Sequence, residues 1–286
     1  MSGRPIKRNS TAPVDAGSAP PHQESGFYDN PAWYDLVHAQ GTLDDIRLLE
    51  RLNRTYGTGG TCWLEPACGT GRYLAALARR RYRVTGYDLN ENALAYARRR
   101  LRKYGRRAVA VSGDMTAFVR SAHYDLAFNL INTFRHLLHE SQAAAHLSCI
   151  ARCLRPGGIY VLGLDLLDYR KPEPVEDVWK ARRGVLSAQH VMMAIPPERA
   201  IGDRLSGKAH ECARRERIVN FLTISTPRGG SRMFESAYEL RTYDLRELLA
   251  TLARSPFEVV AAFHPGGSPI ALNERTRDVL LVLKTR

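Results

Sequence analysis

Thr61 to Asn90 reads TCWLEPACGTGRYLAALARRRYRVTGYDLN, and the topology of the chain can be worked out from it. It begins with a short apolar run, 62–64, whose length predicts a buried strand. A turn of small residues follows, and from Thr70 onward leucine and alanine recur at helical spacing. A second predicted strand, 82–87, ends at Asp88. Strand, glycine turn, helix, strand and acid are the parts with which α/β proteins bind a ribose and the group attached to it.

The turn itself, Glu65–Gly71, narrows the type of nucleotide-like ligand. Its small residues let the backbone pass close to a ligand. A dinucleotide fingerprint needs G-x-G-x-x-G/A. Counting from Gly69, Leu74 occupies the last position, and counting from Ala67, Arg72 does. The sequence therefore does not carry that fingerprint.

The pattern Glu65-x-Ala67-x-Gly69-x-Gly71, followed by Asp88, resembles the first two motifs of the class I S-adenosylmethionine-dependent methyltransferases. Ala67 stands where the family has its first glycine. Two later stretches also resemble this family: the GDM of 113–115 after a predicted strand at 108–112, and the LRPGG of 154–158 before an apolar strand. The resemblance spans about 65–165.

The resemblance implies S-adenosylmethionine as the cofactor, together with a set of residues that bind it. Asp88 would accept the ribose hydroxyls, Asp114 would accept the adenine amine, and Met115 would pack on the adenine ring. Arg72 would pair with the methionine carboxylate or with solvent. The implied cofactor-binding set is Glu65, Ala67, Gly69, Gly71, Arg72, Asp88, Leu89, Asp114, Met115 and Asn129.

The predicted fold is α/β, a doubly wound, Rossmann-like sheet of seven strands with a closing antiparallel hairpin at 257–263 and 278–284. The buried strand 124–131 places Asn129 to Asn132 at its carboxyl end, where such sheets bind ligands. Between about 168 and 242, strands follow one another without helices, which predicts an antiparallel β insertion after the fifth strand. Its alternation of apolar and polar residues predicts that one face covers the carboxyl ends of the main strands. The alternation is seen in Val219, Phe221, Thr223 and Ser225.

Residues 1–25 hold almost no large apolar side chain, so we expect a disordered tail before a domain at 26–286. The aromatic segment 27–35 has two interpretations: a cap on the sheet edge, or a lid whose Tyr28 or Tyr34 reaches the substrate. His136 is likewise either a general base or part of a polar helix end. His136 and His139 lack a third ligand, so no metal site is expected. The five cysteines suggest reduced thiols in a cytoplasmic protein.

The net charge of +13 raises the question of a nucleic acid or membrane partner. Arginine is dispersed through the chain beside abundant alanine, and its clusters lie at expected helix ends, which favours a solvated surface. No apolar run approaches the roughly 20 residues of a membrane helix. These features indicate a monomer or homodimer that acts on a small molecule and disfavour nucleic acid as its partner.

Three functions are compatible with the resemblance. The first is a methyltransferase that transfers the methyl group to a nitrogen or oxygen of a small molecule by in-line displacement. The second is an RNA or protein methyltransferase, but the Asn/Asp-Pro-Pro-aromatic motif of the nucleic-acid N-methyltransferases is not matched by the NLIN of 129–132. The third is a cofactor-binding protein without transferase activity, which the glycine turn and Asp88 disfavour.

Overall fold

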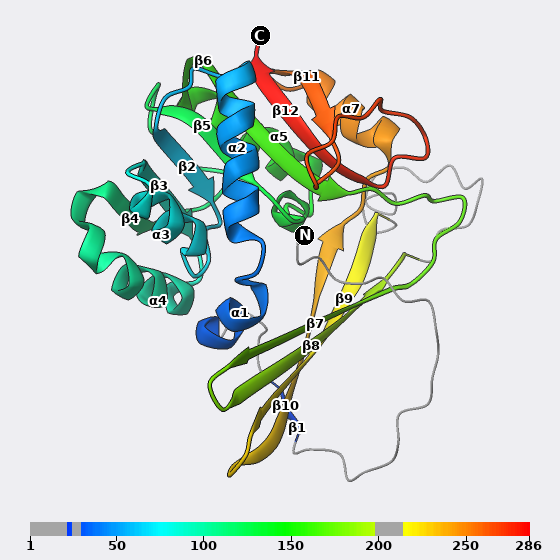
Figure 1. Cartoon of the computed structure of the whole chain (residues 1–286). Coiled ribbons are helices and arrows are strands. Elements are labelled where there is room, and N and C mark those ends of the chain that lie inside the picture. Colours follow the sequence, from blue (N-terminus) through cyan, green and yellow to red (C-terminus); the bar gives the residue numbers. More distant parts are fainter. Residues whose placement is uncertain (1–21, 25–29, 198–213) are drawn as a thin grey trace.

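The computed structural model describes residues 22–24, 30–197 and 214–286, and within these ranges seven strands form the main sheet (Figure 1). The order is β11-β12-β6-β5-β2-β3-β4. The strands are β2 (Cys62–Pro66), β3 (Arg83–Asp88), β4 (Ala108–Ser112), β5 (Tyr124–Asn129), β6 (Leu154–Asp165), β11 (Phe257–Phe263) and β12 (Asp278–Thr285). The first five are mutually parallel, while β12 is antiparallel to both β6 and β11. The predicted doubly wound sheet with its closing antiparallel hairpin is confirmed.

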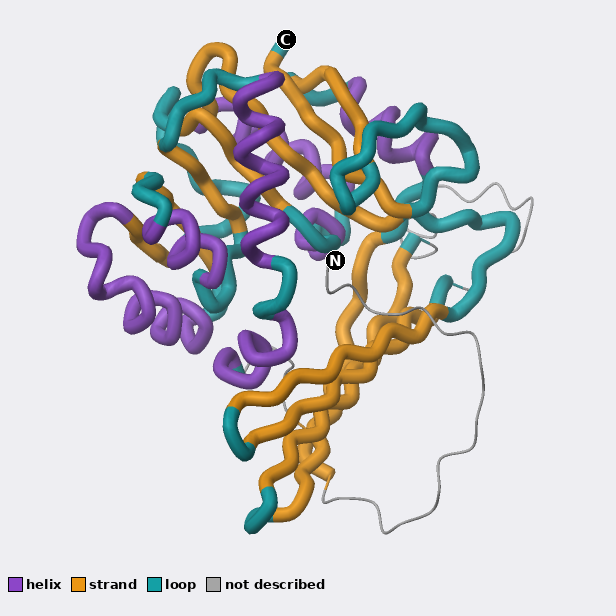
Figure 2. Tube along the Cα trace, in the orientation of Figure 1, coloured by secondary structure: helices purple, strands orange, loops and turns teal. Residues whose placement is uncertain are grey.

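Helices cover both faces of this sheet. One face packs against α2 (Thr42–Tyr56), α3 (Arg72–Arg79) and α4 (Glu91–Leu101), and the other packs against α5 (Glu140–Cys153) and α7 (Leu245–Ala253) (Figure 2). The helices bury the residues that recur at helical spacing, such as Leu74 and Leu77 of α3, which are fully buried. Short 3₁₀ turns, η2 (Arg102–Arg107) and η3 (Thr133–His136), follow α4 and β5.

The predicted insertion is confirmed as a second sheet, which lies beyond the carboxyl ends of the main strands (Figure 1). It consists of β7 (Val175–Arg183), β8 (Leu186–Ile195), β9 (Arg215–Thr226) and β10 (Gly230–Arg241), each antiparallel to the next. A short helix, α1 (Pro31–His38), contacts β7 and β8, and its Leu36 and Val37 share an apolar cluster with Leu222 of β9. The second sheet therefore buries one face.

The buried face of β9 is not the one that the quoted alternation suggests. The set 219, 221, 223 and 225 is only half-buried, whereas Ile218, Asn220, Leu222 and Ile224 are buried. Because alternate residues of a strand point to opposite faces, the two sets lie on opposite sides of the sheet. The inward face thus includes a polar residue, Asn220, among apolar ones.

The amino-terminal segment expected to be disordered contains one described strand. β1 (His22–Glu24) runs parallel to β10, with His22 opposite Met233. At these three residues the structure differs from the expectation, because the outer edge of β10 offers backbone groups with which an extended segment can pair. Residues 1–21 and 25 of the expected tail lie outside the described residues.

Two further observations concern the cysteines and membrane-spanning helices. Cys62, Cys68, Cys149 and Cys153 are buried free thiols, and Cys212 lies outside the described residues. None of the helices in the described part of the chain is long and apolar enough to span a membrane.

Candidate active site

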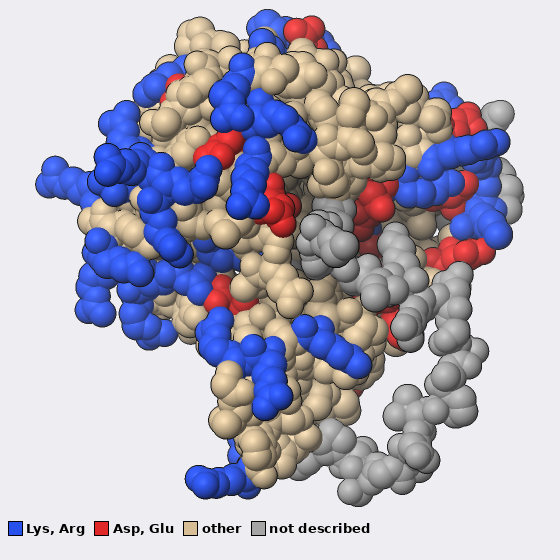
Figure 3. Space-filling model, in the orientation of Figure 1, with Lys and Arg blue, Asp and Glu red and all other residues tan. Residues whose placement is uncertain are grey.

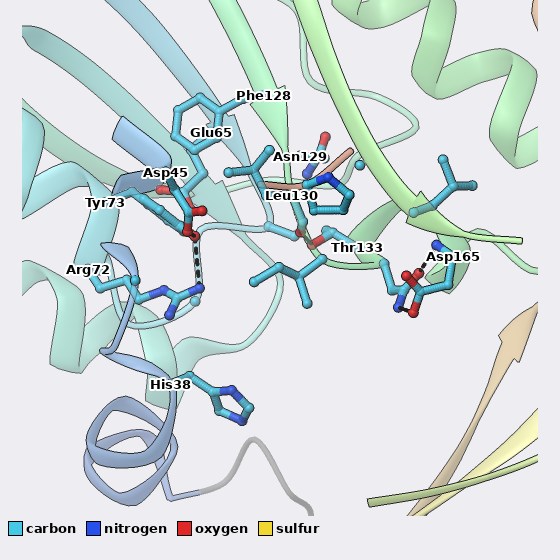
Figure 4. A pocket seen from close by; sticks show the side chains of 18 of the residues that line it. His38, Asp45, Glu65, Arg72, Tyr73, Phe128, Asn129, Leu130, Thr133 and Asp165 are labelled. Atoms are coloured by element: carbon cyan, nitrogen blue, oxygen red, sulfur yellow. Dashed lines mark hydrogen bonds between the residues drawn. The ribbon is translucent and has the colours of Figure 1, made fainter. Parts of the chain in front are cut away.

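A cavity of about 480 Å³ lies where the strands of the main sheet end, between this sheet, the helices α1 and α2, and the second sheet (Figure 4). The lining comes from the glycine turn after β2, the loop after β5, the α1–α2 region, the end of β6, the 265–266 loop, the start of β12 and the inward face of the second sheet. Of the predicted site residues, the cavity is lined by Tyr34, Glu65, Ala67, Gly69, Arg72, Asn129 and His136. The cavity therefore brings together predicted residues of the glycine turn, of the loop after β5 and of the aromatic segment 27–35.

Three residues of the glycine turn have left-handed backbone conformations, and the side chain of Asp88 accepts a hydrogen bond from the turn. The φ angles of Ala67, Gly69 and Gly71 are +49°, +51° and +66°. The Gly69 N–H donates to Oδ2 of Asp88 at 2.7 Å, and the N–H of Asn90 donates to Oδ1 of Asp88 at 2.9 Å. Asp88 therefore fastens the turn to the end of β3, a role that the sequence did not predict.

Glu65 and Arg72 provide opposite charges near this turn. Glu65 is buried, and its Oε2 atom has no hydrogen-bond partner among the described residues. Burial raises the pKa of Glu65 well above its usual range, and the nearby Arg72 opposes this rise. Arg72 donates to the Tyr73 hydroxyl at 3.0 Å, and that hydroxyl donates to Asp45 at 2.7 Å (Figure 4). A buried carboxylate oxygen without a partner is a binding position for a cationic donor.

Several predicted cofactor residues lie beside the cavity rather than in its lining. Gly71 precedes α3 and packs against α4, and Leu89 is 68% exposed at the end of β3. Asp114 is exposed and accepts hydrogen bonds from the backbone N–H and the hydroxyl of Thr116. The half-buried Met115 follows it. Leu89, Asp114 and Met115 follow the ends of β3 and β4, where the resemblance places the adenosine part of the cofactor.

Helix α1 forms a wall of the cavity and is fastened to the glycine turn. The hydroxyl of Thr70 donates to Asp35 of α1 at 3.1 Å, and Arg100 of α4 forms an ion pair with the same carboxylate. This arrangement places Tyr34 in the cavity lining, and its contact with a substrate stays a prediction. Tyr28, the other residue predicted to reach the substrate, lies outside the described residues.

The second sheet adds lining residues that the sequence analysis missed. Trp179 and His190 lie opposite each other on β7 and β8, and their rings are stacked with centroids 4.9 Å apart. His38 of α1 lies 5.3 Å from the Trp179 ring and 5.4 Å from that of His190. Burial lowers the pKa of His190 to about 4 and that of His38 well below its usual range, so both imidazoles are neutral near pH 7.

A second row across the same sheet joins an acid, a thioether and an amide. Asp177 pairs with Met192, and Met192 pairs with Asn220. All three line the cavity. Asn220 is only 1% exposed; its Oδ1 lies 3.0 Å from Nε2 of His190, and its Nδ2 has no partner among the described residues. In the sequence, Asn220 is a polar residue among apolar residues at alternate positions, but only the structure shows that this face points inward.

His136, the predicted base, lies on the loop side of the cavity. It follows β5 in η3, and its ring stacks on Tyr238 of β10 with centroids 5.4 Å apart. It therefore sits between the main sheet and the second sheet, where an acceptor molecule would contact both. Its catalytic role stays a prediction. Among the described residues, no cluster of three or more His, Cys, Asp or Glu side chains could hold a metal ion.

The lining of the cavity is acidic although the chain is basic. Among the described lining residues, Arg72 is the single lysine or arginine, against six carboxylates. These are Asp44, Asp45, Glu65, Asp165, Asp177 and Asp278. Lysine and arginine cover much of the outer surface, while acidic side chains lie near the hollow between the two sheets (Figure 3). The cavity therefore favours cations and neutral polar groups.

Comparison with known proteins agrees with this geometry. A family model described as a methyltransferase domain matches residues 64–158. A dTDP-3-amino-3,6-dideoxy-alpha-D-glucopyranose N,N-dimethyltransferase of Streptomyces fradiae is 32% identical over 133 residues, which cover 45% of this chain and 50% of that protein. A ubiquinone biosynthesis O-methyltransferase of Idiomarina loihiensis is 28% identical over 60% of this chain and 65% of its own length. The aligned regions span about half the length of the first curated relatives.

Solved structures share the fold over nearly the whole chain. DesVI of Streptomyces venezuelae superposes with a TM-score of 0.69 at 19% identity, covering 92% of this chain and 100% of that one. CalS10 of Micromonospora echinaspora, an amino pentose methyltransferase solved with S-adenosylmethionine bound, superposes with a TM-score of 0.57 at 22% identity, covering 87% and 91%. Residues 64–158 thus match a methyltransferase-domain model, and the chain has the fold of these methyltransferases.

Proposed function

We propose that this chain, with its methyltransferase domain at residues 64–158, transfers the methyl group of S-adenosylmethionine to a nitrogen atom of a small molecule. The observation that carries the proposal is a cavity with two unlike sides. On one side lie the glycine turn, Glu65 and Arg72, and on the other lies the inward face of the second sheet. A cofactor on the first side and an acceptor on the second would meet inside one cavity.

The residues near the glycine turn fit the charges of this cofactor. The unpartnered oxygen of Glu65 would accept from the ammonium group of its methionine part, and Arg72 would pair with its carboxylate. Asp88 would accept the ribose hydroxyls, in addition to the bond that it accepts from Gly69. The exposed Leu89 and Asp114 lie where the adenine would need an apolar surface and an acceptor.

Methyl transfer from a sulfonium requires mainly that the acceptor atom and the methyl group are aligned. The bound cofactor supplies a methyl group that its sulfonium activates; the acceptor lone pair attacks the methyl carbon in line with the C–S bond, and the bond electrons leave with sulfur. Holding the two reactants in this geometry can supply roughly 7–11 kcal/mol of the barrier. The walls formed by α1 and the second sheet would limit the access of water to the reacting atoms. No nucleophilic side chain is needed.

The lining of the second sheet supports an amine as the acceptor. An amine acceptor needs hydrogen-bond acceptors around it, and the imidazoles of His38 and His190, which burial keeps neutral near pH 7, can accept a hydrogen bond from an amine N–H. The amide of Asn220 and the carboxylate of Asp177 flank Met192, about 5 Å to either side at ordinary strand spacing. They can bind oxygen and ammonium groups at two edges of a ring. The S. fradiae relative is an N,N-dimethyltransferase of an amino sugar, which supports a nitrogen acceptor.

Calorimetric titration with S-adenosylmethionine and S-adenosylhomocysteine tests the cofactor half. Replacing Asp88 by Ala removes a charged acceptor for the ribose, at a cost of about 1.5–3 kcal/mol, so the affinity should fall roughly tenfold to a hundredfold. Glu91→Ala is the control, because Glu91 begins α4 on its solvent side and pairs only with the exposed Arg98 among the described residues. Unchanged affinity in a folded Asp88→Ala protein would contradict the ribose assignment.

Label transfer tests the acceptor half. Methyl-labelled S-adenosylmethionine is incubated with the protein and a panel of small amines, alcohols and phenols, and the products are analysed by mass spectrometry. Label bound to nitrogen supports the proposal. Label found on oxygen alone, or on RNA or protein added in parallel, would contradict it.

A further inference from the structure

Buried polar groups form a continuous chain of hydrogen-bonding contacts behind the candidate cofactor site. His146 Nδ1 of α5 lies 3.1 Å from the carbonyl oxygen of Met115, and its Nε2 lies 3.0 Å from the hydroxyl of Tyr160 on β6. That hydroxyl lies 2.8 Å from Oδ1 of Asn129, whose Nδ2 donates to the carbonyl of Pro66 at 2.9 Å. His146, Tyr160 and Asn129 are 0%, 0% and 2% exposed.

The two ends of this chain belong to different parts of the cofactor site. Met115 follows Asp114, the residue predicted to accept the adenine amine. Pro66 precedes Ala67, a non-glycine residue whose backbone lies in the left-handed region. Such a conformation persists only where its surroundings enforce it. His146 and Tyr160 are not among the described residues that line the cavity. Their contacts with the site run through other groups.

The chain has one proton fewer than its contacts require. The Met115 carbonyl and Asn129 Oδ1 only accept, and three contacts lie between them. A neutral imidazole and one hydroxyl supply two protons. Burial lowers the pKa of His146 to about 4, so its imidazole is neutral near pH 7. A proton on Nδ1 satisfies the contact with Met115 and leaves the Tyr160 hydroxyl to donate either to Nε2 or to Asn129, whereas a proton on Nε2 lets Tyr160 donate to Asn129 and leaves the Met115 contact without a proton. The tautomer of His146 therefore determines which of the three contacts lacks a proton.

We propose that His146 and Tyr160 are positioning residues for the cofactor: they fix the carbonyl groups of Met115 and Pro66 relative to each other and so hold the adenine end and the glycine turn at the spacing that the cofactor needs. The inference rests on the proposed function, because it names S-adenosylmethionine as the ligand. Its physical basis is that a buried network restrains the backbone groups that it contacts, while no water is at hand to replace a lost partner.

Tyr160→Phe tests the proposal, with Tyr124→Phe as its matched control. Tyr124 is equally buried but starts β5 at the end opposite Asn129. Both variants lose one buried hydroxyl, so both report its general cost in a melting curve. Calorimetric titration with S-adenosylhomocysteine should show about fivefold to tenfold weaker binding for Tyr160→Phe, the loss expected for about one hydrogen bond. The affinity of Tyr124→Phe should stay within about twofold of wild type.

Two variants of His146 separate the ends of the chain. Asn places an amide near the Nδ1 position and keeps a donor for Met115, whereas Gln places an amide near Nε2 and keeps a partner for Tyr160. With adenosine as the probe, which lacks the methionine part and so depends less on the glycine turn, His146→Gln should bind more weakly than His146→Asn. Equal binding of adenosine by these two variants would contradict the assignment of the Met115 end.

The outcomes distinguish this inference from the proposed function. A folded Tyr160→Phe protein with wild-type affinity for S-adenosylhomocysteine overturns the inference, as does an equal loss in Tyr124→Phe. If Tyr160→Phe does not fold, wild-type affinity for S-adenosylhomocysteine in both His146 variants overturns it instead. A wild-type protein that binds no S-adenosylhomocysteine overturns the proposed function and, with it, this inference.

Discussion

The glycine turn shows how single residues set the geometry of the site. Ala67 and Gly71 both have positive φ angles, +49° and +66°, but their surroundings differ. A Cβ atom added at Gly71 would lie 3.1 Å from that of Ala97 on α4, which is tighter than ordinary contact. Gly71 is therefore required both by its conformation and by the close approach of α4. At Ala67 the turn tolerates the methyl group, which explains how the chain departs from the family pattern at this position.

We predict that an exchange at Gly71 costs more stability than one at Ala67. Gly71→Ala should lower the free energy of unfolding by about 1–2 kcal/mol for the left-handed conformation alone, with the contact to Ala97 adding to it. Ala67→Gly relieves backbone strain in the folded state but raises the conformational entropy of the unfolded state. The stability of this variant should therefore stay within about 1 kcal/mol of wild type. Urea denaturation followed by circular dichroism measures both. A Gly71→Ala protein as stable as wild type would show that α4 moves aside.

At this scale the sequence predicted the residues whose positions follow from local spacing. Glu65, Gly69 and Asp88 lie within one strand–turn–helix–strand unit, so their order along the chain places them together. His190 and Asn220 were not predicted, because strand register, and not sequence distance, brings them into the cavity. Tyr160 was missed for a related reason: a tyrosine in a buried strand looks apolar until its partners are known.

At the scale of elements, an ion-pair cluster joins the second sheet to the helices behind the main sheet. Glu140, the first residue of α5, pairs with Arg241 at the end of β10 and with Arg254 after α7, and it accepts from Thr251 of α7 at 2.9 Å. Burial raises the pKa of Glu140, but the hydrogen bonds from Arg241 and Arg254 outweigh it and lower the pKa to about 2. The cluster therefore contributes to docking the second sheet over the cavity.

The low pKa of Glu140 makes this contribution depend on pH. A carboxyl group whose pKa is depressed by folding stabilises the protein above its unfolded value, near 4.5, and the stabilisation is lost as the pH falls towards about 2. Glu140→Gln should cost about 1–3 kcal/mol at pH 7, nearer the lower figure because the side chain is partly exposed. In urea titrations, the difference from wild type should shrink between pH 5 and pH 3. Glu91→Gln, which disrupts an exposed pair with Arg98, is the control and should change stability little. A difference that stays constant with pH would contradict the role of the ionised carboxyl group.

The elements themselves were largely predictable, since their periodicity is local. The strands at 108–112 and 257–263 are found where the apolar residues predicted them. The sequence does not show which face of β9 points inward, because both faces carry a mixture of apolar and polar residues. The choice depends on α1, whose Leu36 and Val37 pack on the even-numbered residues. The pairing of β1 with β10 was also beyond prediction, since β1 lacks the apolar pattern of a strand.

At the scale of the whole molecule, the sign of the charge differs between the surface and the cavity. The chain has a net charge of +13, yet six carboxylates and a single arginine line the cavity among the described residues. A phosphate backbone that entered this cavity would meet carboxylates such as Asp177 and Asp278. Composition alone could not separate these two regions, because the net charge sums over both. The charge therefore says little about the acceptor until the fold is known.

We predict that RNA and DNA are not retained at physiological salt and that methyl transfer to a small amine is nearly indifferent to ionic strength. A protein that neutralises phosphates loses affinity with a log–log slope of about −0.9 per contact on duplex DNA, so 6–10 contacts lose roughly 10³–10⁵ between 50 and 200 mM salt. A small acceptor enclosed between Trp179 and the glycine turn releases few counterions, so its KM should change by less than about threefold over this range. Filter binding with labelled RNA and DNA, and initial rates at both salt concentrations, measure the two quantities. Retention of either nucleic acid at 150 mM salt with a steep slope would mean that the arginine-rich surface, and not the second sheet, selects the partner.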